Sequence, residues 1–159
     1  MPASALTVAN QFLELAKAEG KTLDNMQLQK LVFLAQGYSL GITGNALFKD
    51  EIRAWRWGPV IPRLYNRLKK YGAGYVTELI PLEPQMGTVG TQEMRLIAAV
   101  WKAFKSYSGI ALSQLTHQKG TPWKETPEQG VITEPLMMAY YRALTNAGGT
   151  TATTSAATA

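Results

Sequence analysis

The chain has 159 residues, of which 46% are hydrophobic and 17% charged, with a formal net charge of +5. This size and apolar content suit one globular domain and exclude an intrinsically disordered chain. No apolar run reaches the roughly 18 to 20 residues that span a bilayer, and the first residues lack the pattern of a secretory signal, so we expect a cytoplasmic protein without membrane contact. Cysteine is absent, which excludes disulfides, thiol catalysis and zinc–thiolate sites.

Two helices are predicted in the first part of the chain. Apolar residues recur at helical spacing over residues 4–19, and Gly20 follows as a stop signal. A second helix begins after Asp24, which can cap its free amide groups while Gln27 reaches back in a capping box. This helix is expected to end between residues 37 and 41.

An alternating stretch over residues 52–57 then predicts a short hairpin strand. Gly58 and Pro59 are expected to end that strand and turn the chain into a further helix. Pro62 suits the first turn of this helix, which should continue to about Tyr71. Its inward-facing residues are expected to be Ile61, Leu64, Tyr65 and Leu68.

The rest of the pattern is helical with two long loops. It predicts a loop over 72–90, helices from Thr91, over 109–116 and from Thr133, and a loop over 118–130. We therefore expect a mainly α protein, a single compact domain of about six helices with a small β-hairpin, over residues 1–145. The Gly, Thr, Ala and Ser tail over 146–159 is expected to be disordered.

Groups able to carry catalysis are few. His117 is the only histidine, so a multi-histidine metal site cannot form within one chain. Asp24 and Asp50 are the only aspartates, and the first is explained as a helix cap. Ser108 or Ser113 could pair with His117, but the nucleophile-elbow motif of a hydrolase is missing. We expect no enzyme activity, no cofactor and no metal.

The basic residues concentrate between residues 49 and 71, and this stretch has two interpretations. It is either a solvated basic helix face or a partner-binding surface, because Arg and Trp are the residue types that anchor interfaces. The candidate partner-binding residues are Arg53, Trp55, Arg56, Arg63, Arg67 and Lys70. The same arginines could contact single-stranded nucleic acid, although no helix-turn-helix pattern precedes them.

Two later residues are interpreted as structural. His117 is expected to close the 109–116 helix and hydrogen-bond a carbonyl oxygen. Trp123 follows Pro122 and is expected to fold back on the core, because a tryptophan buries a large area.

Four segments occur in an order that resembles one family. They are MQLQKLVFLAQG (26–37), EIRAWRWGPVIP (51–62), Tyr65 with KYG (70–72), and LSQLTH (112–117) followed by Pro122-Trp123. They resemble the LQKLLYFAQG helix, the AW-x-x-GPV-x-P segment, a tyrosine with a Lys-Tyr-Gly stretch, and the LS-x-LTH…PW signature of the Panacea domain, also called SocA-like or GepA-like. The positions that match its architectural motifs are Lys30, Trp57, Gly58, Pro59, Tyr65, Thr116, His117 and Trp123.

The resemblance implies function by protein binding. Panacea domains act as antitoxins that neutralise a toxin by direct contact, one branch resembles an adaptor that delivers a toxin to the ClpXP protease, and many members come from phages and mobile elements. We therefore expect an antitoxin-like protein. The alternatives are a phage or prophage accessory protein that binds a host defence factor or protease, and a nucleic-acid-binding protein that uses the local basic patch.

Overall fold

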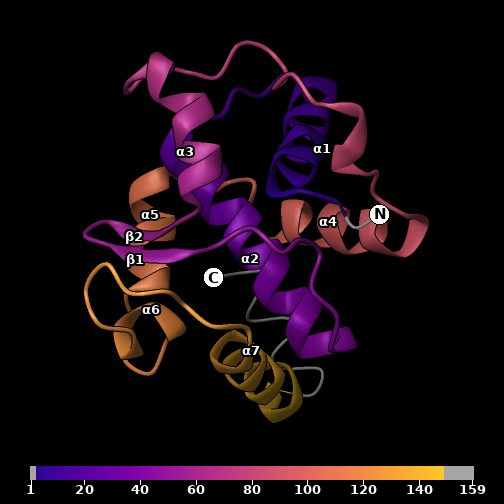
Figure 1. Cartoon of the computed structure of the whole chain (residues 1–159). Helices are drawn as coiled ribbons and strands as arrows, with labels where there is room; N and C mark the ends of the chain where they lie inside the picture. The colour runs from indigo at the N-terminus through magenta and orange to yellow at the C-terminus, as the bar shows by residue number, and fades with distance from the viewer. Residues whose placement is uncertain (1–2, 149–159) are drawn as a thin grey trace.

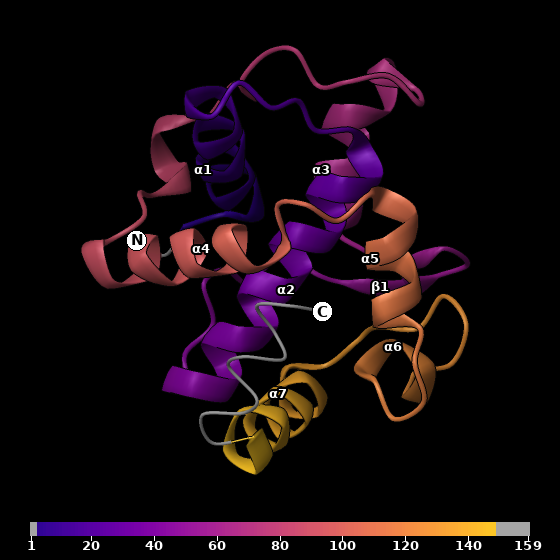
Figure 2. The ribbon, with the colours of Figure 1, turned by 180° about the vertical axis from the view of Figure 1, so that it is seen from behind.

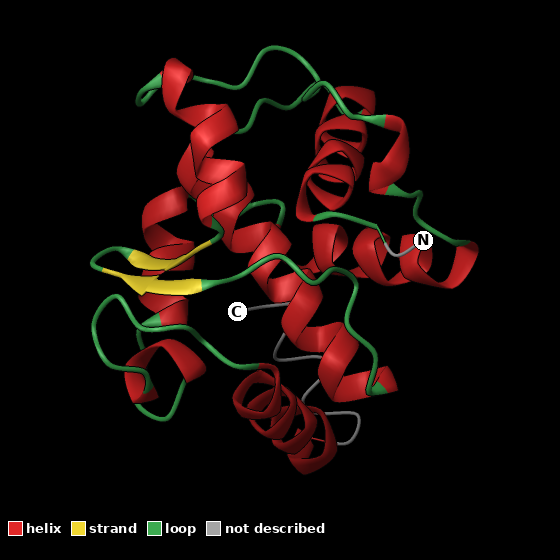
Figure 3. Ribbon diagram, viewed as in Figure 1, coloured by secondary structure: helices red, strands yellow, loops and turns green. Residues whose placement is uncertain are grey.

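The computed structural model describes residues 3–148, and within this range the chain is mainly helical with one small sheet (Figures 1 and 3). The mainly α fold with a small hairpin, expected from the sequence, is confirmed. The α-helices are α1 (Ala5–Ala18), α2 (Asn25–Thr43), α3 (Pro62–Leu68), α4 (Thr91–Phe104), α5 (Gly109–Thr116), α6 (Pro122–Glu125) and α7 (Glu134–Gly148). The strands are β1 (Arg53–Trp55) and β2 (Gly58–Val60), and the 3₁₀ turns are η1 (Lys69–Tyr71) and η2 (Pro84–Met86).

Helix α2 is the centre of the molecule. It runs through the middle of the ribbon, with α1 and α4 on one side, the hairpin and α5 on the other, and α7 against its C-terminal half (Figures 1 and 2). Residues 28–37 and 39–41 are all buried. A helix that is buried all round lacks a polar face, so its apolar periodicity indicates only part of its contact surface.

Local signals at the ends of α2 explain where it begins and ends. The Asp24 carboxylate accepts a hydrogen bond from the Gln27 amide at 2.8 Å, and the Gln27 side chain accepts one from the Asp24 amide at 3.0 Å. This is the capping box expected from the sequence. At the other end, the helix continues past the end expected between residues 37 and 41 and stops at Gly44, which adopts the left-handed conformation at φ +78.

Two glycines bring α7 into close contact with α2. A Cβ atom added at Gly41 would lie 2.7 Å from the backbone carbon of Tyr141 and 2.8 Å from the amide nitrogen of Arg142. One added at Gly37 would lie 2.5 Å from the Tyr141 ring. The Arg142 guanidinium also donates to the Gly41 carbonyl at 3.2 Å. Backbone approach of this kind needs residues without side chains.

The hairpin differs from its sequence prediction at one point. Gly58 and Pro59 do not end the strand, since they form β2, which pairs antiparallel with β1 in the register Arg53↔Val60, Ala54↔Pro59 and Trp55↔Gly58. Ala54 directs its N–H and C=O away from β2, to the Gly130 carbonyl and the Gln129 amide. Proline has no backbone N–H to donate, and Ala54, the residue opposite Pro59, does not require a donor from β2.

The second half of the chain contains one more helix than expected. The stretch 118–130, expected to be a loop, contains α6, which Thr121 caps by accepting from the Lys124 amide at 3.3 Å. Helix α7 runs to Gly148, past the expected domain end at residue 145. The rest of the expected disordered tail, from residue 149, lies outside the described residues. Across residues 3–148, none of the helices combines the length and the hydropathy that crossing a membrane requires.

Candidate functional site

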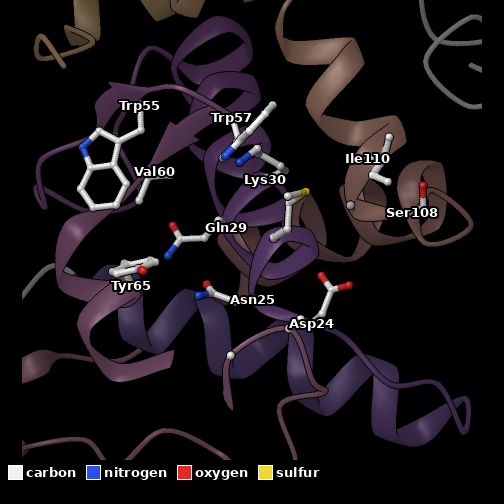
Figure 4. Close-up of a pocket in the computed structure, with 14 residues that line it drawn as sticks. Asp24, Asn25, Gln29, Lys30, Trp55, Trp57, Val60, Tyr65, Ser108 and Ile110 are labelled. Atoms are coloured by element: carbon white, nitrogen blue, oxygen red, sulfur yellow. The ribbon is translucent and has the colours of Figure 1, made fainter. Parts of the chain in front are cut away.

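A pocket of about 480 Å³ lies where the N-terminal half of α2 faces the hairpin, α3 and the start of α5. Figure 4 shows Trp55, Val60 and Tyr65 on one side of it, Ile110 and Ser108 on the other, and Lys30, Gln29 and Asn25 between them. Asp24, Met26, Trp57, Gly72, Ala73 and Gly109 complete the lining. Most of the wall is therefore apolar, with a few polar groups at fixed places, which is the composition of a ligand pocket.

Three consecutive carbonyl groups of the hairpin are held by side chains from α5 and α6. The Trp123 indole N–H donates to the Trp55 carbonyl at 2.7 Å, the Ser113 hydroxyl donates to the Trp57 carbonyl at 2.6 Å, and His117 Nε2 lies 3.3 Å from the Arg56 carbonyl. These contacts fix the hairpin tip at one edge of the pocket. Two of these side chains also lie where a structural role was expected: His117 ends α5, and Trp123 is half-buried against the core.

Gly58 makes room for Lys30 beneath the hairpin. A Cβ atom added at Gly58 would lie 2.7 Å from Lys30 Cε and 3.3 Å from His117 Cε1. Gly58 also has φ +120, a conformation that other residues rarely adopt. His117 in turn packs on the Trp123 ring, with ring centroids 3.7 Å apart. The segments that resembled one family in the sequence therefore meet around Lys30.

Lys30 is a buried charge without a counter-ion. The residue is 2% exposed, and its ammonium forms no ion pair with any residue in the range 3–148. Burial lowers the pKa of Lys30 from 10.5 to about 8, and the charge of Asp24 offsets part of that effect. Asp24 is already occupied as the cap of α2. Lys30 thus remains largely protonated at neutral pH in a site that disfavours its charge.

Two amide side chains of α2 also carry polar atoms without partners. Gln29 accepts a hydrogen bond from the Ile61 amide at 2.9 Å, and this contact determines which of its ends is the oxygen. Its Nε2 atom is buried and has no acceptor within the described residues, and Asn25 Oδ1 likewise has no donor. Buried polar groups are nearly always hydrogen-bonded, so these two atoms of the pocket wall are available to water or to a bound ligand.

Large apolar side chains are exposed at the pocket rim. Trp57, in the turn of the hairpin, is 61% exposed, and Ile110, on α5, is 69% exposed; both line the pocket. Tyr65, expected to face inward, is 36% exposed and lines the pocket instead, with its ring 5.2 Å from that of Trp55. Exposed apolar residues around a pocket are typical of interaction sites.

Each basic residue of the expected partner-binding set makes a contact within the chain. Their contacts are Arg53 with Glu51, Arg63 with Asp50, Arg67 with the Pro81 carbonyl, Arg56 over the Trp57 ring and Lys70 over the Tyr71 ring. Trp55 is the member of this set that lines the pocket. Sequence reasoning missed Asn25, Gln29 and Ile110 as site residues, and it assigned Lys30 an architectural role only. A lysine within an otherwise apolar helical stretch was the available signal.

The serine–histidine pair considered for catalysis is used inside the fold. Ser113 Oγ lies 3.4 Å from His117 Nδ1, but its proton goes to the Trp57 carbonyl. His117 Nδ1 faces the Ser113 carbonyl. Within residues 3–148, no group of three or more His, Cys, Asp or Glu side chains could hold a metal ion.

The sequence matches the family described as antitoxin SocA-like, Panacea domain, over residues 28–124. It is similar to antitoxin SocA of Caulobacter vibrioides (strain NA1000 / CB15N), with 36% identity over 72 residues, which are 45% of this chain and 38% of the relative. The match thus spans well under half of that relative. No solved structure matches the chain. The chain belongs to the antitoxin SocA-like, Panacea domain family.

Proposed function

We propose that this protein is a cytoplasmic antitoxin that neutralises a toxin by direct protein–protein binding and does not act as an enzyme. The observation that carries the proposal is the family match, which includes Lys30, the hairpin and the α5–α6 residues that hold it. The exposed apolar rim of the pocket supports a binding role. The absence of enzyme activity is supported by Ser113. Its hydroxyl donates to a backbone carbonyl, whereas a serine nucleophile needs that proton removed by a base.

Co-expression tests the proposal. The product of the gene adjacent to this one is expressed in a bacterial host alone, and then together with the antitoxin candidate. We expect growth arrest in the first case and growth in the second, with a stable complex of the two purified proteins. Absence of toxicity in the adjacent product, or arrest that persists with both proteins present, would remove the antitoxin role.

Direct blocking and delivery to a protease are separated by the level of the toxin. Blocking by contact leaves the toxin at constant abundance, whereas an adaptor shortens its half-life in cells that contain the protease. Immunoblots after translation arrest measure this half-life. We propose blocking as the mechanism, so a toxin half-life that is unchanged by the antitoxin is the expected result.

A further inference from the structure

Two hydrogen-bond donors on the same stretch of α2 lack an acceptor. They are Lys30 Nζ, which has no ion pair, and Gln29 Nε2, which has no hydrogen-bond partner among the described residues. Both residues are 2% exposed and both line the pocket. The buried Gln29 Nε2 costs folding free energy while it is unpaired, and the Lys30 ammonium lacks a counter-ion, so a bound anionic group that accepts from either donor would be favoured.

A carboxylate matches the chemistry of these two donors. Among the 14 lining residues shown in Figure 4, Lys30 is the one cation and Asp24 the one anion. Asp24 lies at the far end of the pocket from the Lys30 ammonium (Figure 4) and is held as a helix cap. A phosphate would bring more negative charge and more acceptor oxygens than this mostly apolar wall can match, whereas one carboxylate matches one ammonium and one amide N–H.

The rim indicates that the carboxylate belongs to a larger molecule. Trp57 comes from the hairpin and Ile110 from α5, both line the pocket, and each exposes more than half of its surface. A small free acid inside the pocket would leave both uncovered. A peptide segment that crosses the opening can cover both with the residues before and after the acidic one. A chain terminus could extend to one side only.

We propose that this pocket binds an Asp or Glu side chain within a continuous segment of a protein partner, and that apolar residues flanking it cover Trp57 and Ile110. The carboxylate accepts from Lys30 Nζ and Gln29 Nε2. Asn25 Oδ1, a further buried atom without a partner in the pocket lining, is an acceptor available to an N–H of the same segment. This inference deepens the proposed function, because it rests on the protein partner that the antitoxin role requires.

Peptide selection tests the proposal without knowledge of the partner. The purified full chain is used to select from a library of random dodecapeptides joined at both ends to constant linkers, and from a second library with free carboxyl ends. Selected peptides are synthesised with a fluorescent label, and their affinities are measured by anisotropy. We expect Asp or Glu, flanked by apolar residues, in the binders from the first library, and loss of affinity by about tenfold or more when the acid is replaced by its amide.

Two variants and one control link the peptides to the pocket. Lys30→Met removes the ammonium and keeps the length of the side chain. Gln29→Glu keeps the acceptor for the Ile61 amide and replaces the free N–H by a competing carboxylate. Both should lose about tenfold or more in affinity for the acidic peptides. Lys102→Met, an exposed position on α4 outside the pocket, should bind as the unaltered chain does. Circular dichroism and melting confirm that each variant is folded.

The outcomes separate this inference from the proposed function. Selection of peptides without acidic residues, of terminal carboxylates only, or of none would overturn the pocket assignment. So would acidic peptides that bind both variants normally. The toxin adds a separate comparison: if Lys30→Met and Gln29→Glu still neutralise it as the unaltered chain does, the antitoxin role stands and the pocket assignment fails.

Discussion

The two halves of helix α2 follow opposite rules. In the C-terminal half, Gly37 and Gly41 let α7 approach until backbones are in contact, and Arg142 pairs with the last carbonyls. In the N-terminal half, Gln29 and Lys30 face an open pocket with donors that nothing in the described chain satisfies. The C-terminal half therefore stabilises the fold. The N-terminal half leaves polar groups unpaired at a cost in stability, which is typical of surfaces kept for a partner.

The largest expected effect on stability is in the C-terminal half of α2, where α7 packs closely. Gly41→Ala should lower the free energy of unfolding by more than about 3 kcal/mol, because the new Cβ meets backbone atoms of α7 that cannot move without shifting the helix. Urea denaturation measures the change. Gly90→Ala is the control, since its Cβ meets only the flexible Glu93 carboxylate. Equal stability in the two variants would mean that α7 does not lie against Gly41.

The second effect concerns the support of the hairpin. Trp123→Ala should lower the free energy of unfolding by about 3 kcal/mol, because the half-buried ring packs on His117 and its N–H holds the Trp55 carbonyl. The matched control is Trp57→Ala, which removes a ring that is 61% exposed and should change stability by well under about 1 kcal/mol. Thermal melting of both variants distinguishes a supporting tryptophan from a rim tryptophan.

In the N-terminal half of α2, which faces the pocket, substitution should stabilise the chain. Lys30→Met should raise the free energy of unfolding at pH 7 by about 2 to 3 kcal/mol, because it removes a buried charge whose pKa is lowered from 10.5 to about 8. A loss of stability in this variant would show that the ammonium has a partner in the free protein. The same variant is expected to lose affinity for acidic peptides, so stability and binding should move in opposite directions.

The gain should also depend on pH. The folded-state pKa of Lys30 lies below the unfolded value, so the folded chain binds fewer protons between pH 8 and 10.5 and the unaltered chain gains stability as pH rises through that window. The advantage of Lys30→Met should therefore shrink by about 1 kcal/mol between pH 7 and pH 9. Asp24, Tyr65 and His117, the other titratable groups around the pocket, are common to both proteins. Urea denaturation at both pH values measures the difference, and a constant advantage would mean that Lys30 does not titrate there.

The smallest effect is expected on the basic surface. Reversing the charges of Arg63 and Arg67 should weaken toxin binding by only about threefold, the size typical of exposed charges, because each already has a contact within the chain. Titration calorimetry with the toxin, next to Lys30→Met, compares the two surfaces. A larger loss in the arginine double variant than in Lys30→Met would move the main contact from the pocket to the basic surface.

The sequence by itself determined the elements whose signals are local. Helix starts such as Asp24 with Gln27, the stop at Gly20 and the turn before Pro62 depend on residues three or four positions apart, so they were predictable. The expected fold class was confirmed for the same reason. Helix α6 was missed because a single turn is too short to produce a periodic pattern.

Only the tertiary structure decided what the polar residues of α2 do. Lys30 and Gln29 were visible in the sequence, but whether a buried donor has an acceptor depends on segments more than 20 residues away, such as the hairpin and α3. Gly58 was interpreted as a strand breaker, whereas its position over Lys30 shows that it makes space for that side chain. A pocket is a property of several elements packed together, and unpaired atoms are recognised only when every neighbour is in place.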